Sequence, residues 1–268
     1  MGLGEIYNYL FVELSVPYTR EWSLIATPYP LMLIIFMYIY FVLYAGPRYM
    51  KNRPPYELRT FILIYDVIQI LANLWFVKEH ISAGWSTEVV FDGIFYMSNC
   101  VTRSKLPLNM IKLFDMVWLL GFLKLFDFVE TCIFVLRKKQ NQVSGLHVYH
   151  HVSNLTFFWY YLKYLLDERA TFISLFNCAV HVIMYIYYFI AGWSPDLQRL
   201  ISPVKPFITK LQMVQFIVMI AVIVPPILNP NCELQRGIAI IFIGNLLVFL
   251  YLFNDFYKKS YTSKQKNK

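Results

Sequence analysis

The feature that most constrains this chain is a series of apolar runs, each long enough to cross a lipid bilayer. Crossing about 30 Å of hydrocarbon takes about 20 helical residues, and the chain of 268 residues holds seven such runs. We expect these spans at 26–46, 59–78, 113–136, 146–165, 170–191, 207–228 and 236–256. No run alternates apolar and polar residues as a barrel strand would, so the expected fold is an all-α polytopic membrane protein.

Composition agrees with this expectation. Hydrophobic residues make up 58% of the chain and charged residues 15%, whereas a soluble domain is about 25% charged. These proportions exclude an ordinary cytosolic globule, a disordered chain and a disulfide-rich secreted module. The formal net charge of +8 favours anionic partners, such as lipid headgroups or a phosphate-bearing substrate. We expect no nucleic-acid partner.

The basic residues predict an orientation. Fifteen of the 24 lysines and arginines follow the first, third, fifth and seventh spans, and the positive-inside rule places those loops in the cytosol. The N-terminus is then luminal and the C-terminus cytosolic, as an odd number of spans requires. We therefore expect a luminal segment over 1–25 without the basic n-region of a signal peptide, a transmembrane domain over 26–256, and a basic cytosolic tail over 257–268.

Two of the four cysteines fall in the predicted luminal loops. An oxidising lumen would permit a disulfide between Cys100 and Cys232, and the alternative is two unrelated free thiols. Cys132 and Cys178 lie inside spans, where we expect packing roles.

The first polar cluster inside the membrane opens the fourth span. It reads His147-Val148-Tyr149-His150-His151, and positions i, i+3 and i+4 share one helix face. Imidazoles so placed suit metal ligation, general acid–base work or nucleophilic acyl transfer. The plainer alternative is a set of histidines hydrogen-bonded at a helix end.

Two further clusters lie in the fifth and third spans. In the fifth, His181, Tyr185 and Tyr188 form a polar stripe, although an interfacial belt could also explain the tyrosines. In the third, Lys124 and Asp127 can pair at i, i+3, which lowers their burial cost. A purely structural ion pair is the alternative there.

Glutamines and acids complete the set of polar residues. Glu130 follows the Lys124 pair, and Gln212 and Gln215 offer amide groups at the cytosolic start of the sixth span. Asp66, Gln69 and Asn73 are spaced at i, i+3 and i+7 in the second span.

Metal chemistry is disfavoured by the histidine count. A di-iron oxygenase centre needs more than the five histidines present, and His80 falls in a predicted luminal loop. A single zinc could use three histidines, but neighbouring imidazoles on one helix do not easily share a tetrahedral ion. We therefore expect no metal and no cofactor. The alternative class, a non-enzymatic seven-span lipid-binding receptor or transporter, lacks support from an Asp-Arg-Tyr triplet or an Asn-Pro-x-x-Tyr motif.

Several motifs carry a family resemblance over nearly the whole chain. His147 to His151 matches a His-x-x-His-His box, His181 to Tyr188 matches His-x-x-Met-Tyr-x-Tyr-Tyr, and Thr209 to Gln215 matches Thr-x-x-Gln-x-x-Gln. Residues 46–54 look like the loop after the first span, and residues 264–268 like a Lys-x-Lys-x-x retrieval signal. The sequence resembles the ELO family of very-long-chain fatty acid elongases, which are 3-oxoacyl-CoA synthases of the endoplasmic reticulum membrane.

One motif departs from the family pattern. The third span of the family usually reads Lys-x-x-Glu-x-x-Asp-Thr, whereas this chain has Asp127 and Glu130 in exchanged order before Thr131. The charges survive, and each carboxylate shifts by one methylene. We interpret the exchange as conservative.

The resemblance implies an acyltransferase that condenses a long-chain acyl-CoA with malonyl-CoA. It implies 3-oxoacyl-CoA, carbon dioxide and CoA as products. Because no cysteine accompanies the histidines, we hypothesise that His150 carries the acyl group, with His147 and His181 stabilising the enolate or oxyanion. Lys124 and Gln212 would be further donors, and His151 would orient its neighbours. A direct ternary reaction, with the histidines acting only as bases, is the alternative.

The resemblance also implies partners and a location. The cations at the predicted cytosolic mouth are candidates for binding the CoA phosphates, against a plain positive-inside bias: Arg137, Lys138, Lys139, Lys205 and Lys210. Membrane lipids, other enzymes of the elongation cycle and a second copy of the chain are the further expected partners. The expected location is the endoplasmic reticulum membrane, with several spans.

Overall fold

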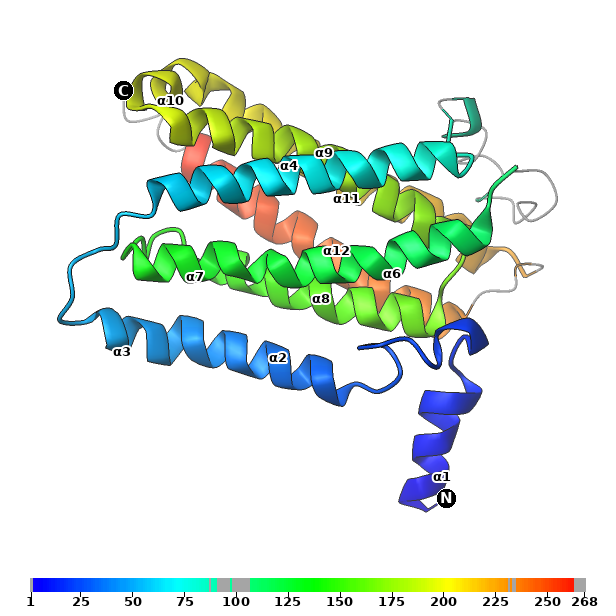
Figure 1. Cartoon of the computed structure of the whole chain (residues 1–268). Helices are drawn as coiled ribbons and strands as arrows, with labels where there is room; N and C mark the ends of the chain where they lie inside the picture. Colours follow the sequence, from blue (N-terminus) through cyan, green and yellow to red (C-terminus); the bar gives the residue numbers. More distant parts are fainter. Residues whose placement is uncertain are drawn as a thin grey trace. The chain divides into compact units, whose positions relative to one another are not determined.

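The computed structural model describes residues 2–86, 88–90, 97, 107–230, 232 and 235–262. Within these residues all regular structure is helical, and no strand occurs (Figure 1). Helices satisfy their own backbone hydrogen bonds, which is the condition for crossing hydrocarbon. The all-α prediction is therefore confirmed for the part of the chain that the structure describes.

Five segments are long and apolar enough to span a membrane. They are Tyr29–Met50, Arg59–Ser82, Glu168–Trp193, Pro195–Leu228 and Arg236–Thr262. They correspond to the first, second, fifth, sixth and seventh predicted spans. Large apolar side chains lie exposed on them, for example Phe36, which is 63% exposed. Such a surface is costly in water and suits lipid contact, so the chain is a multi-pass membrane protein.

The third and fourth predicted spans are also helical, but they differ from the five segments above. The third consists of α6 (Met110–Phe126) and α7 (Phe128–Leu136), which are separated at Asp127. The fourth is α8 (Gly145–Tyr164), whose 20 residues extend about 30 Å. Neither is among the five segments, because the third is divided into helices of 17 and 9 residues, while the polar side chains of α8 lower the hydropathy of the fourth. A total of seven spans, and the luminal N-terminus, stay predictions.

The chain divides into two compact units. Unit 1 comprises Met1–Glu57 and Trp118–Ala170. Unit 2 comprises Leu58–Val117 and Thr171–Lys268. The His147–His151 box belongs to unit 1 and the His181 stripe to unit 2, so each is described within its own unit.

In unit 1, α2 (Tyr29–Tyr40) packs on α8, and α3 (Gly46–Met50) packs on α7 (Figure 1). Gly46 permits the second contact, because a Cβ there would lie 2.7 Å from Val135 Cγ1. A π-helical turn, η3 (Phe41–Ala45), joins α2 to α3. The prediction of a loop from residue 46 onward was wrong for 46–50, because Pro47 sits in the first turn of α3, where its missing N–H costs nothing.

The predicted N-terminal segment is attached to the far end of α8. It forms α1 (Leu3–Asn8), η1 (Tyr9–Glu13) and η2 (Pro17–Thr19). The backbone N–H of Val16 donates to the Lys163 carbonyl at 2.8 Å, and Lys163 Nζ donates to the Ala26 carbonyl at 3.1 Å. These bonds fix the chain that enters α2.

The loop after α8 is anchored by Asp167. Asp167 Oδ1 accepts the backbone N–H groups of Arg169 and Ala170, and Oδ2 pairs with the Arg169 guanidinium. Burial raises the pKa of the Asp167 carboxyl to about 6, although the guanidinium opposes the shift. The carboxylate caps the start of α9 (Glu168–Trp193).

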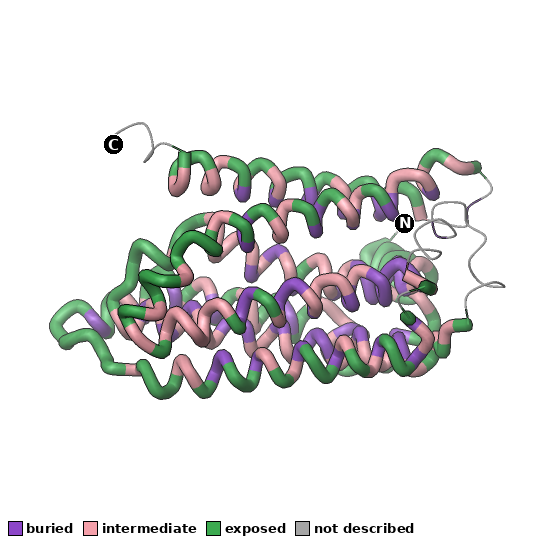
Figure 2. The backbone as a smooth tube through the Cα atoms, turned by 90° about the horizontal axis from the view of Figure 1, so that it is seen from above, coloured by how far each residue is buried: buried purple, intermediate pink, exposed green. Residues whose placement is uncertain are grey.

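Unit 2 contains α4 (Arg59–Ser82), most of α9, α10 (Pro195–Ile201), α11 (Lys205–Leu228) and α12 (Arg236–Tyr257), and Phe172, Leu175 and Val222 belong to its apolar core. The short turns η5 (Ser202–Val204) and η6 (Lys258–Thr262) flank α11 and α12. Phe216 stacks on Phe249 with ring centroids 5.1 Å apart, which joins α11 to α12. Figure 2 shows buried and exposed residues alternating along these helices, as packed helices with lipid-facing sides require.

Candidate active site

The histidine box begins in the first turn of α8. Ser144 is the N-cap residue, and its hydroxyl accepts the backbone N–H of His147 at 3.2 Å. A serine cap fixes where a helix starts, so it also fixes which way the box faces. The rings of His147 and His151 lie 4.4 Å apart, as expected for i, i+4 neighbours.

A hydrogen-bonded chain reaches His147 from two other helices. The Tyr38 hydroxyl, on α2, donates to Thr131 Oγ1 on α7 at 2.9 Å. Thr131 Oγ1 in turn lies 2.9 Å from His147 Nε2, and the tautomer of the ring decides which of the two donates. Tyr38 is buried and stacks on Phe128 at 3.9 Å. Three helices therefore hold one imidazole.

Glu130 joins two of the histidines. Its carboxylate and one nitrogen each of His147 and His151 all lie within 4.8 Å of one another. Glu130 was predicted as a polar residue of the third span, and α7, which runs beside the start of α8, brings it to the box (Figure 1). The three residues are a potential metal-ligand group, whereas His150 is not a member.

His150 has a different environment. Asn154 Nδ2 lies 3.1 Å from His150 Nε2. Since an amide nitrogen can only donate, Nε2 accepts, and the proton of a neutral ring sits on Nδ1. The His150 ring meets the His151 ring edge-on at 5.4 Å. This geometry presents a half-buried, neutral imidazole with its lone pair at Nε2.

The ion pair that the spacing predicts is present in the same unit. Lys124 Nζ lies 3.4 Å from Asp127 Oδ2, and both side chains are buried. Asp127 stands at the interruption between α6 and α7. A buried cation is thereby held with its counter-charge near the turn of chain that also carries Glu130 and Thr131.

In unit 2, His181 is held by its own helix. His181 Nδ1 lies 2.8 Å from the Asn177 carbonyl oxygen. A carbonyl only accepts, so Nδ1 carries the proton, and in the neutral ring the lone pair belongs to Nε2. Tyr185 packs beside it with ring centroids 6.0 Å apart, and Tyr188 packs on Tyr185 at the same separation. The predicted stripe is therefore continuous.

The α4 helix supports this stripe, which the sequence alone did not indicate. The Tyr65 hydroxyl lies 3.4 Å from the Tyr185 hydroxyl and accepts a hydrogen bond from Gln69 Nε2 at 2.9 Å. Asn73 Nδ2 donates to Gln69 Oε1 at 3.3 Å. The spacing of Gln69 and Asn73 had indicated a polar face on the second span, and both are buried, whereas the part played by Tyr65 was not predicted.

The prediction that His80 lies in a luminal loop was wrong about the loop. His80 lies in the last turn of α4 rather than in a loop, and it is fully buried. Its Nδ1 donates to the Phe76 carbonyl at 2.8 Å, and its Nε2 lies 2.6 Å from Ser174 Oγ. The helix runs four residues beyond the predicted end at residue 78, because these bonds satisfy the imidazole inside the unit.

The sixth predicted span contributes amide groups to unit 2. Gln212 Nε2 contacts Met184 Sδ at 3.3 Å, and Gln215 is buried on the same helix, α11. Lys205 and Lys210 are exposed at the start of α11. Lys210 Nζ lies 5.4 Å from the centre of the Tyr257 ring, which orients it by a cation–π contact.

The remaining cation candidates follow α7 in unit 1. Arg137 is half-buried, whereas Lys138 and Lys139 are exposed. Lys138 adopts a φ of 54° and reaches the Lys51 carbonyl with its Nζ at 3.4 Å. The chain turns sharply here, and the turn leaves the neighbouring cations open to solvent.

The predicted disulfide between Cys100 and Cys232 lies only partly within the described residues. Cys232 takes part in a disulfide, while the thiols of Cys132 and Cys178 are reduced. The predicted partner, Cys100, lies outside the described residues, as does the tail from residue 263 onward. The pairing therefore stays a prediction.

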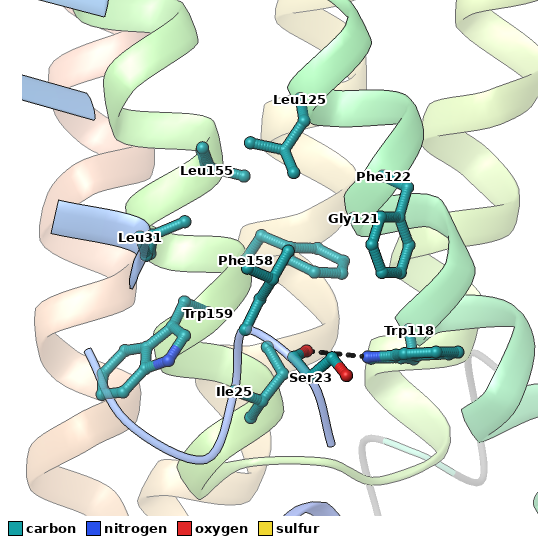
Figure 3. Close-up of a pocket in the computed structure, with 11 residues that line it drawn as sticks. Ser23, Ile25, Leu31, Trp118, Gly121, Phe122, Leu125, Leu155, Phe158 and Trp159 are labelled. Carbon is teal, nitrogen blue, oxygen red and sulfur yellow. Dashed lines mark hydrogen bonds between the residues drawn. The ribbon is translucent and has the colours of Figure 1, made fainter. Parts of the chain in front are cut away.

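Unit 1 also contains an apolar pocket beyond the histidine box (Figure 3). It has a volume of about 10 Å³ and begins one helical turn after His151, at Leu155, continuing to Phe158 and Trp159 on α8. Trp118 Nε1 donates to the Ser23 carbonyl at 3.1 Å across its end. A cavity of this size has room for about one water molecule, so its apolar lining is nearly closed, and it offers no charge for chemistry.

Comparisons with known proteins agree with the motifs. The family model described as "ELO: GNS1/SUR4 family" matches residues 23–268. The chain is 33% identical over 255 residues to very long chain fatty acid elongase AAEL008004 of Aedes aegypti, covering 94% of this chain and 68% of that protein. It is 33% identical over 251 residues to very long chain fatty acid elongase 7 of Rattus norvegicus, covering 93% and 87%.

Proposed function

Since this chain belongs to the ELO (GNS1/SUR4) family, we propose that it is a very-long-chain 3-oxoacyl-CoA synthase. Its similar proteins are named very long chain fatty acid elongases, which supports a role in fatty acid elongation. The substrates would be a long-chain acyl-CoA and malonyl-CoA, and the site would be in the endoplasmic reticulum membrane. No metal or cofactor takes part in the proposed reaction.

The observation that carries the mechanism is the hydrogen bond from Asn154 to His150. It holds His150 as a neutral ring with its proton on Nδ1, and when the thioester carbonyl takes the place of the Asn154 amide at Nε2, the lone pair there becomes the nucleophile. His150 Nε2 attacks the thioester carbonyl, the carbon–sulfur bond breaks, and CoA leaves with a proton. The product is an acyl-imidazole on His150.

Malonyl-CoA then binds in place of the departed CoA. Loss of carbon dioxide leaves an enolate of acetyl-CoA, whose carbon attacks the acyl carbonyl and expels the imidazole. We propose that His181 stabilises the developing negative charge, together with His147, Lys124 and Gln212. The Nδ1–H of His181 is committed to the Asn177 carbonyl, so His181 would donate from Nε2 when it is protonated.

Two regions would hold the rest of the substrate. The exposed lysines after α7 and at the start of α11, with Arg137, would bind the CoA phosphates. The acyl tail needs an apolar channel, and the apolar side chains from Leu155 to Trp159 would have to part to admit the tail along α8.

Trapping the intermediate tests this mechanism. Purified chain mixed with a long-chain acyl-CoA, without malonyl-CoA, should accumulate one acyl group that intact-protein mass spectrometry detects. His150→Ala should abolish the adduct, whereas Cys132→Ala, which removes the free thiol beside Thr131, should keep it. An adduct lost in Cys132→Ala and kept in His150→Ala would show that the Cys132 thiol, and not His150, is the nucleophile.

The kinetics provide a second test. Ping-pong turnover gives parallel double-reciprocal lines as the two substrates are varied. Intersecting lines together with no trapped adduct would favour the direct ternary reaction, in which the histidines act only as bases.

A further inference from the structure

Three potential metal ligands meet where α7 passes the start of α8. Glu130, His147 and His151 each offer one ligand atom, and these atoms lie within 4.8 Å of one another. Two histidines and a glutamate are a known ligand set for Zn²⁺. Histidines at i and i+4 on one helix face can hold one metal ion together. The sequence-based objection was that neighbouring imidazoles on one helix do not easily share a tetrahedral ion; the i, i+4 pair is the spacing that can, and the structure adds a carboxylate from another helix as the third ligand.

The surroundings of His147 fit a metal ligand. An imidazole that binds a metal through one nitrogen usually hydrogen-bonds through the other. Thr131 Oγ1 accepts the Tyr38 proton and has a second lone pair for His147 Nε2–H. In that tautomer the lone pair of His147 lies on Nδ1, where a metal can bind. Thr131 and Tyr38 thus supply an outer shell that orients the ring.

We propose that Glu130, His147 and His151 form an inhibitory Zn²⁺ site. The metal is not a cofactor. It would take the imidazole lone pairs of His147 and His151, with water at the fourth position. His150, bonded to Asn154, stays outside the cluster. The inhibition rests on the proposed function, because it assumes that His147 stabilises charge during condensation, whereas metal binding itself does not.

Cobalt provides a direct readout of the site. The full chain, purified in detergent through a tag without histidine, is titrated with Co²⁺, and its visible ligand-field absorption is recorded. We expect one ion per chain, displaced by Zn²⁺. Glu130→Gln should weaken binding by more than about 100-fold, and Thr131→Val by about tenfold, the lower end of outer-shell effects. Thermal unfolding of both variants checks that they fold.

Matched variants locate the metal. His150→Ala and Cys132→Ala should bind Co²⁺ as the unaltered chain does, since neither residue belongs to the cluster. Binding unchanged in Glu130→Gln, no binding in the unaltered chain, or a thiolate absorption that Cys132→Ala removes would each overturn the proposal.

A second measurement connects the site to catalysis. Zn²⁺ should inhibit malonyl-CoA incorporation by the unaltered chain, and Glu130→Asp, whose carboxylate is one methylene shorter, should need at least about tenfold more Zn²⁺. Equal Zn²⁺ sensitivity of the two chains would overturn the inhibitory role. A chain that binds Co²⁺ but incorporates no malonyl carbon would contradict the proposed function and leave metal binding intact.

Discussion

The two units hold their central histidines in opposite ways. In unit 1, His147 is bonded to Thr131 from α7, and Thr131 is bonded to Tyr38 from α2. In unit 2, His181 is bonded to the backbone carbonyl of Asn177, one turn earlier on the same helix. A hydrogen bond between side chains can be removed by substituting one of the residues, whereas a backbone carbonyl stays in place whatever the residue. Unit 1 should therefore be the more sensitive of the two to changes outside the histidines themselves.

The proposed mechanism assigns formation of the acyl-imidazole to His150 of unit 1 and stabilisation of the condensation step to His181 of unit 2. The largest expected effect tests that division. His181→Ala should reduce condensation by about 10²–10³-fold, because it removes a donor to the developing charge. It should still form the acyl adduct, which accumulates. Quantifying the adduct and the 3-oxo product in one assay separates the steps. If His181→Ala formed neither the acyl adduct nor the 3-oxo product, His181 would be needed for acylation too, and the proposed division of steps between the units would be wrong.

The next effect concerns the support of His147. Thr131→Val keeps the volume but removes the hydroxyl between Tyr38 and His147. We expect kcat to fall about tenfold with little change in KM, since a misplaced acid–base group loses part of a contribution of about 10²–10⁴-fold. Steady-state kinetics of Tyr38→Phe, expected to fall less, provide the matched comparison. A Thr131→Val enzyme with full kcat would show that His147 needs no outside support.

A smaller effect is expected from the corresponding support in unit 2. Tyr65→Phe removes the hydroxyl that lies 3.4 Å from that of Tyr185, while Gln69 loses its acceptor. A neutral hydrogen bond contributes about 1 kcal/mol, so we expect kcat to fall no more than about fivefold. Parallel measurement with Thr131→Val ranks the two units. A larger loss in Tyr65→Phe than in Thr131→Val would reverse the comparison.

The smallest effect concerns product length. A Cβ at Gly121 would lie 2.4 Å from Phe158 Cε1, so Gly121→Ala pushes that ring within the apolar pocket (Figure 3). If the tail follows α8, the longest product should shorten by about one two-carbon cycle. Gly244→Ala on α12, where no atom lies within 4 Å, is the control. Product analysis by chain length decides, and an unchanged profile would exclude the pocket from the tail's path.

The sequence predicted the helices better than their interruptions. Apolar runs predicted the five membrane-spanning segments, because hydropathy over about 20 residues is a strong signal. The interruption at Asp127, the continuation of helix through Gly46–Met50 and the helical position of His80 were not predicted. Each depends on local bonds or close packing between helices, which a single sequence does not record.

The candidate site shows the same limit. Spacing on one helix predicted that His147 and His151 would share a face, and their rings do meet. Tyr38 was not predicted at all, and Glu130 was predicted as a polar residue but not as a neighbour of His147 and His151, because both contacts depend on tertiary packing. Tyr38 in particular lies in an apolar, tyrosine-rich span in which no periodicity marks it.

Incorporation of radiolabelled malonyl-CoA tests the central claim most directly. Membranes containing this chain would be given a panel of long-chain saturated and unsaturated acyl-CoAs, with membranes containing His150→Ala beside them. The account predicts label in a 3-oxo product for at least one primer, and none above background for His150→Ala. Incorporation in both would keep condensation but contradict His150 as carrier. No incorporation with any primer, from a correctly folded chain, would contradict the enzymatic function and favour a non-enzymatic lipid-binding receptor or transporter.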